Sequence, residues 1–123
     1  MRIPTPYELY LAPGTPAREA YDWMFKIYRA MDPNRNGYSP SRKLLAQMRH
    51  VPQIAYLRKP LPADVHVMLL EFISVISRLE DDLQDESLWI NDHTVAEEGR
   101  KAWDEAYAQI GEIMHRKPGD FRK

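Results

Sequence analysis

Apolar residues recur at three- and four-residue steps along most of the chain, which is the spacing of amphipathic helices. Thr15-Pro16 precedes the first stripe, and this pair suits an N-cap followed by the first helical position. Asp32-Pro33 ends the stripe, because the residue before a proline is pushed out of the helical region. We therefore expect a helix between these two pairs. Its buried stripe is Ala17, Ala20, Tyr21, Met24, Ile27, Tyr28 and Met31.

Ser39-Pro40 repeats the same start signal and predicts a second helix, which Pro52 stops. A third helix is predicted over residues 63–85, and its first half is apolar on nearly every side. Such a helix lies at the centre of a bundle or in an interface between subunits. Thr94 and Glu97 match a capping box and predict that a fourth helix begins there and ends near Lys117-Pro118.

No segment alternates in the manner of a strand, so the expected fold class is all-α. We expect a small helical bundle in which the last two helices form a long antiparallel helical hairpin. Nine of the ten prolines fall in residues 1–62, and three of them lie in the first fourteen residues. This predicts an extended, Pro-rich N-terminal arm over 1–14. A single helical domain follows over 15–117, with a basic helical part (15–59), the hairpin (63–117), and then a basic tail (118–123).

Composition excludes several classes of function. The 123 residues include no cysteine, so disulfide frameworks, thiolate metal sites and cysteine nucleophiles are ruled out. The start of the chain has no apolar signal-peptide segment, and no apolar run approaches the roughly 18 residues that span a bilayer. We expect no membrane association and a cytoplasmic location, the host cytoplasm if a phage encodes the chain. The Gly-rich phosphate-binding motifs of nucleotide-binding proteins are also absent.

The net charge of -1 conceals an uneven distribution. Residues 26–59 carry eight basic side chains and one acidic one, whereas residues 64–105 carry twelve acidic and three basic. Clustered lysine and arginine can bind the phosphates of nucleic acid, and they can equally pair with acidic helices of the same or a neighbouring subunit. For the first hypothesis, the candidate DNA contacts are Arg35, Arg42, Lys43, Arg49, Arg58 and Lys59.

Other chemistries have weaker support. Residues 32–37 look like the start of a calcium loop, but Lys43 stands where a bidentate glutamate is needed. Asp82 and Asp85 approach the spacing of a magnesium-dependent nucleotide hydrolase, yet no second acidic pair matches, which favours a solvated acidic loop. The histidines share no metal-ligand spacing. We expect no enzyme activity, no metal and no cofactor. The candidate contacts with a protein partner are Tyr7, Tyr10, Trp23, Phe25 and Trp89.

A stretch beginning at Ser39-Pro40 and running through Leu44-Leu45 and His50 to residues 61–67 (Leu-Pro-Ala-Asp-Val-His-Val) resembles the small terminase subunits of short-tailed phages, over about residues 39–83. The resemblance implies a ring-forming, non-enzymatic subunit that recognises viral DNA and presents it to a motor ATPase. It would assign DNA contact to Arg42, Lys43 and Arg49.

Two functions therefore compete. The first is an oligomerising phage-type accessory protein that binds DNA through its basic part, with a role in genome packaging. The alternative is a protein-interaction module, such as an inhibitor of a host enzyme, an adaptor or a virion component, with no nucleic-acid binding. In either case we expect a homo-oligomer and membership of a larger complex.

Overall fold

The computed structural model describes residues 3–38, 55–91 and 94–118, and these are mostly helical, as predicted. The helices are α1 (Pro6–Tyr10), α2 (Pro16–Ala30), α3 (Pro33–Asn36), α6 (Ala63–Asp82) and α7 (Arg100–Met114). Residues 55–57 are also helical. The helix predicted from Ser39-Pro40 to Pro52 lies outside the described residues, and so do Arg42, Lys43 and Arg49. The basic tail is described only at Pro118.

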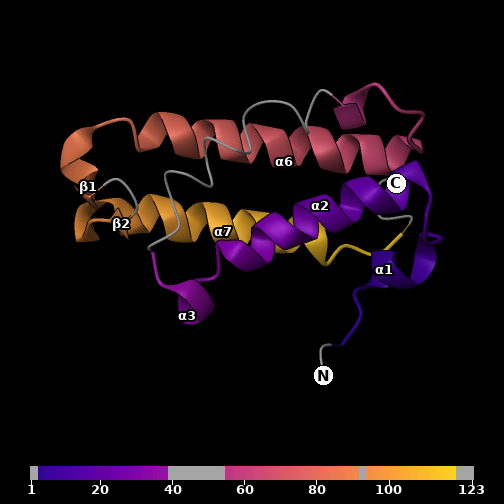
Figure 1. Cartoon of the computed structure of the whole chain (residues 1–123), viewed down its shortest axis with the longest axis horizontal. Coiled ribbons are helices and arrows are strands. Elements are labelled where there is room, and N and C mark those ends of the chain that lie inside the picture. The colour runs from indigo at the N-terminus through magenta and orange to yellow at the C-terminus, as the bar shows by residue number, and fades with distance from the viewer. Residues whose placement is uncertain (1–2, 39–54, 92–93, 119–123) are drawn as a thin grey trace.

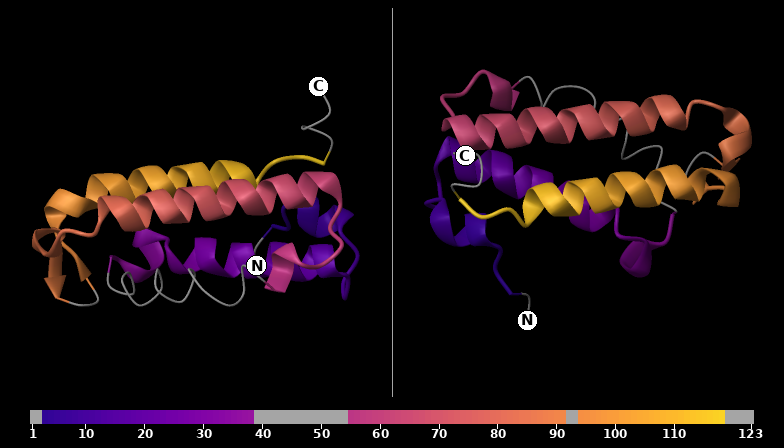
Figure 2. Two further views of the ribbon diagram at one scale, coloured as in Figure 1. Left: turned by 90° about the horizontal axis from the view of Figure 1, so that it is seen from above. Right: turned by 180° about the vertical axis from the view of Figure 1, so that it is seen from behind.

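Three long helices form the body of the molecule. α6 and α7 lie side by side and run in opposite directions, and α2 packs against both of them (Figure 1). α1 packs against α2 near its first turn, whereas α3 follows the last turn of α2 (Figures 1 and 2). The hydrophobic core fills the space between these helices. None of the described helices is long and apolar enough to cross a membrane.

α2 begins and ends as its sequence signals predict. The Thr15 hydroxyl accepts the backbone N–H of Arg18 at 3.2 Å, and Pro16 occupies the first helical position, where no N–H is needed. The predicted stripe faces the core, although Tyr28 is only half-buried, and Phe25 is buried as well. The helix therefore buries a face wider than the stripe, because α6 and α7 approach it from two sides.

α6 begins at Ala63 as predicted but ends at Asp82, before the expected Asp85. The Asp85 carboxylate accepts the backbone N–H of Ser87 at 2.9 Å and caps a short 3-10 helix, η1 (Glu86–Leu88). The backbone hydrogen bond from Ser87 lowers the pKa of Asp85. A cap for the next element cannot also continue the previous helix, so α6 stops early.

Two predictions for the connection between α6 and α7 are wrong: that it contains no strand, and that a helix begins at Thr94. Residues that carry no alternating pattern form two short antiparallel strands, β1 (Trp89–Asn91) and β2 (Thr94–Val95). Thr94 is thus in a strand instead of capping a helix. A second 3-10 helix, η2 (Glu97–Gly99), comes before α7. The capping-box signal is local, whereas pairing between residues 89 and 95 places Val95 in the core. That burial decides the backbone conformation.

The prediction of an extended arm is wrong for residues 6–10. The Thr5 side chain caps α1, and the Glu8 carboxylate accepts the backbone N–H of Thr5 at 3.3 Å, which completes a capping box. Pro6 stands at the first helical position, where proline is tolerated. Tyr7 is fully buried, and its hydroxyl donates to Asp64 at 2.9 Å. α1 is therefore part of the fold.

Two long-range hydrogen bonds tie α2 to α7. The Tyr21 hydroxyl donates to the carbonyl oxygen of Met114 at 2.7 Å, and the Trp103 indole N–H donates to the carbonyl oxygen of Met31 at 2.9 Å. All four groups are buried, so each bond satisfies a polar atom that would otherwise lose its hydration without compensation. The first bond fixes the N-terminal half of α2 against the end of α7, and the second fixes the C-terminal end of α2, beside the basic residues that follow.

Candidate nucleic-acid interface

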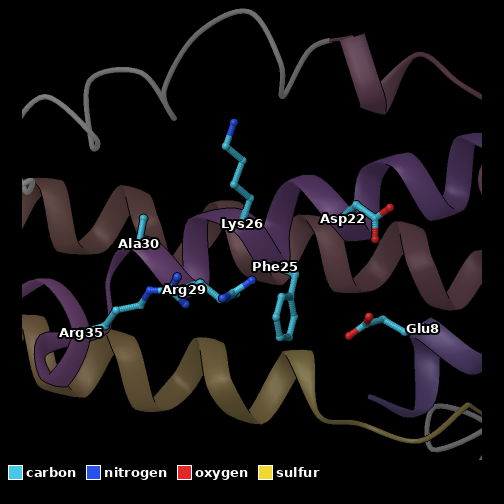
Figure 3. Close-up of a pocket in the computed structure, with 7 residues that line it drawn as sticks. All are labelled: Glu8, Asp22, Phe25, Lys26, Arg29, Ala30 and Arg35. Carbon is cyan, nitrogen blue, oxygen red and sulfur yellow. The ribbon is translucent and has the colours of Figure 1, made fainter. Parts of the chain in front are cut away.

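Three basic side chains line one pocket beside the C-terminal half of α2; Arg29 and Arg35 lie close to each other there, whereas Lys26 extends away from them (Figure 3). The pocket has a volume of about 420 Å³, and its basic residues come from α2 (Lys26 and Arg29) and from α3 (Arg35) (Figure 3). The other lining residues are Glu8, Asp22, Phe25 and Ala30. Lys26 and Arg35 are exposed and Arg29 is half-buried. A cluster of this kind, open to solvent, is suited to a phosphate or another anion.

The local sequence explains why Arg35 reaches this pocket. Asp32 accepts the backbone N–H of Asn34 at 2.9 Å and caps α3, with Pro33 at its first position. The chain therefore turns directly after α2, so that Arg35 lies at the C-terminal end of that helix. Arg29 lies in the last turn of α2, where the partial negative charge of the helix end favours a cation.

The acidic lining residues lie at the opposite end of the pocket in Figure 3, with Phe25 between the two groups. Asp22 accepts the Arg18 side chain at 2.9 Å, and Glu8 is held in the capping box of α1. Both carboxylates therefore have partners on their own side of the pocket. Arg29 and Arg35 lie at the other end of the pocket, away from these two carboxylates.

The described residues among the predicted DNA contacts do not form one cluster. Arg35 is at the pocket, whereas Arg58 and Lys59 are exposed near the other end of α2. Lys59 lies 3.7 Å from the carboxylate of Glu19, in the first turn of that helix. The two ends of the fifteen-residue helix are about 20 Å apart at 1.5 Å per residue. Lys59 thus pairs with an acidic residue of α2, outside the acidic helices of residues 64–105 that the sequence left open as partners of the basic block, and an exposed pair of this kind contributes little stability.

Lys26 and Arg29 belong to the basic block of residues 26–59 but are not among the predicted DNA contacts. Their three-residue spacing on one predicted helix was a usable signal, because residues that far apart share a helix face. The contribution of Arg35 to the same pocket had no such signal. It depends on the turn between α2 and α3.

Four of the five predicted partner contacts are buried or half-buried in the subunit itself. Tyr7, Phe25 and Trp89 belong to the core, and the Trp89 indole N–H donates to the carbonyl oxygen of Leu83 at 2.7 Å. Trp23 is half-buried, and its ring centroid lies 5.6 Å from that of Tyr56 and 5.5 Å from that of Phe72. Tyr10 is 59% exposed. Trp23 and Phe25 lie off the predicted stripe, which fits either a second buried side of α2 or an exposed contact, and the structure has the second buried side.

The acidic junction between α6 and α7 has no described metal site. Asp81, Asp82 and Glu86 are exposed, and Asp85 caps η1. Within residues 3–38, 55–91 and 94–118, no three acidic or histidine side chains are placed to hold a metal ion together. The described geometry therefore offers no support for the magnesium-hydrolase hypothesis at Asp82 and Asp85.

A second hollow lies between α6 and α7, with a volume of about 280 Å³. Three of its charged residues, Glu71, Glu112 and Arg116, pair with one another. Arg116 donates to Glu112 at 3.1 Å and also contacts Glu71, and these bonds raise the pKa of the arginine. This hollow is therefore a weaker candidate for an anion than the pocket beside α2.

No family model, curated protein or solved structure matches this chain.

Proposed function

We propose that this chain is a non-enzymatic, phage-type accessory protein that forms oligomers and binds DNA through its basic part. The observation that carries this proposal is the pocket that Lys26, Arg29 and Arg35 line. Arginine and lysine side chains there would neutralise backbone phosphates, which positions a duplex without reading its sequence. The resemblance of residues 39–83 to small terminase subunits supports a role in genome packaging within the host cytoplasm.

The salt dependence of binding tests this proposal. The affinity of the full chain for a fluorescently labelled duplex is measured by anisotropy over a series of salt concentrations. Each phosphate neutralised contributes about -0.9 to the slope of log affinity against log salt concentration. Replacement of Lys26, Arg29 and Arg35 by glutamine should therefore make the slope shallower by about 2 to 3.

The control is Lys101→Gln, which removes an exposed positive charge from α7 that does not line the pocket. This variant should leave the slope unchanged. A wild-type chain that shows no salt-dependent binding would refute the DNA-binding function. Unchanged binding by the triple variant would instead refute the assignment of the pocket, and the contacts would then belong to Arg42, Lys43 and Arg49.

One specific observation favours the alternative, a protein-interaction module without nucleic-acid binding. Large apolar side chains near the N-terminus are exposed: Ile3 (87%), Leu9 (76%) and Tyr10 (59%). Such a patch suits contact with a protein. A protein partner bound in fixed stoichiometry by the wild type, lost in Leu9→Asp/Tyr10→Asp and accompanied by no DNA binding, would favour this function.

A further inference from the structure

One face of α6 differs from the exposed faces of the other long helices. The exposed positions of this helix from residue 63 to residue 77 carry no charge: Ala63, Val67, Leu70, Ser74 and Ser77. By contrast, all the exposed positions of α2 are charged. Val67 is 39% exposed and Leu70 is 46% exposed. Seen from above in Figure 2, no other described element crosses α6.

The spacing of these residues is symmetric. Val67, Leu70, Ser74 and Ser77 follow one another at steps of three, four and three residues, which places them on one stripe. When the stripe is read in the opposite direction, the steps are the same. Two copies of α6 that run antiparallel, with a two-fold axis level with Phe72, would therefore bring Leu70 opposite Ser74 and Val67 opposite Ser77.

This register pairs a large side chain with a small one at both of these levels. A serine opposite a leucine leaves room for the larger side chain, so that the two helices can approach closely, as knobs fit into holes. A parallel pair would instead place Leu70 against Leu70 and Ser74 against Ser74. The antiparallel arrangement is thus the one that the sizes of the side chains favour.

The charges beside the stripe agree with the same register. Asp64 and Arg78 flank it on the same side of α6, at about equal distances from Phe72. In the antiparallel pair, Asp64 of each subunit lies within about two residues of the level of Arg78 in the other, roughly 3 Å of helix rise. Opposite charges at that position favour the pairing of two copies.

We infer that this face of α6 binds a second copy of the chain as an antiparallel, two-fold pair centred on Phe72. The inference deepens the oligomeric part of the proposed function and does not depend on DNA. The face, from residue 63 to residue 77, is about 21 Å long and about 10 Å wide, so it covers roughly 200 Å² per subunit. Stable interfaces bury about 800 Å² per partner, and the pair should therefore dissociate on dilution.

Sedimentation velocity of the full chain without DNA, over a wide range of protein concentrations, tests the inference. The wild type should shift from monomer to dimer as the concentration rises, whereas Leu70→Asp should remain monomeric throughout. The control Leu9→Asp alters an exposed leucine outside the face and should keep the wild-type shift. A wild type that remains monomeric, or a Leu70→Asp variant that still associates, would overturn the inference whatever the DNA assay shows.

Cross-linking tests the register. Because the chain has no cysteine, Leu70→Cys and Ser74→Cys each introduce a single thiol. A mixture of the two variants should form mixed disulfide dimers faster than either variant forms dimers alone. Faster linkage within each variant alone would overturn the antiparallel arrangement. Ser74→Leu should weaken dimerisation, and the exchange Leu70→Ser/Ser74→Leu should restore it, because it keeps one large and one small residue at that level. Failure of the exchange to restore dimerisation would contradict this register.

Discussion

Because α1 packs on the helical body through Tyr7, we expect replacement of this residue to lower the free energy of unfolding by a predictable amount. Its side chain is fully buried, its ring centroid lies 6.0 Å from that of Tyr21, and its hydroxyl donates to Asp64. Replacing a buried aromatic residue by alanine costs about 3–5 kcal/mol of unfolding free energy, because apolar burial is lost and a cavity remains. We expect that loss for Tyr7→Ala.

The conservative variant separates the ring from its hydroxyl. Tyr7→Phe keeps the packing and removes only the hydrogen bond to Asp64, whose carboxylate also accepts the backbone N–H of Val65 at 2.9 Å. Asp64 is half-buried, so this variant should cost about 1–2 kcal/mol. Tyr7→Phe keeps the prediction testable if Tyr7→Ala fails to fold.

Urea and thermal unfolding followed by circular dichroism measure both losses. For a chain of 123 residues, each 1 kcal/mol corresponds to about 4 °C in Tm, so Tyr7→Ala should melt about 12–20 °C lower. The control is Leu9→Ala, in the same short helix but 76% exposed, which should change stability by less than about 0.5 kcal/mol. Equal melting temperatures for Tyr7→Ala and Leu9→Ala would refute the docking of α1.

Two further predictions concern the contacts of α7. Trp103→Phe leaves the buried carbonyl of Met31 without its donor, and this should cost about 1–3 kcal/mol in urea unfolding; an unchanged midpoint would contradict the role of that bond. Burial raises the pKa of Tyr107 above its ordinary value near 10, and a hydrogen bond with Tyr28 raises this pKa further. Folding therefore favours the neutral phenol, and its contribution to stability is present below about pH 10 and is lost as the pH rises further. Tyr107→Phe should flatten the loss of stability in alkaline urea titrations, and an unchanged pH dependence would show that this tyrosine does not contribute to it.

Local signals in the sequence were sufficient to predict where α2 and α6 begin. Thr15-Pro16 and Asp32-Pro33 mark both ends of α2, and the proline before Ala63 marks the start of α6. These signals work because capping and the missing proline N–H act within one turn of the chain. The helical class and most of the buried faces of α2 and α6 follow from them.

A local helix signal is also present for α1, but the density of prolines around it favours an extended arm. Thr5 and Glu8 have the spacing of a capping box, and Pro6 stands where proline begins a helix. The density of prolines nevertheless predicted an extended arm. A five-residue helix has little stability of its own, so its existence depends on Tyr7 being buried.

The features that the sequence did not predict depend on contacts between residues far apart in the chain. The capping motif at Thr94 is overridden by pairing with β1 and by the burial of Val95, neither of which a local pattern reveals. In the same way, the sequence by itself determined which residues are basic and on which helix they lie. Only the tertiary structure decided that Arg35 joins Lys26 and Arg29 while Lys59 pairs with Glu19, because the turn after α2 and the packing of its first turn set those distances.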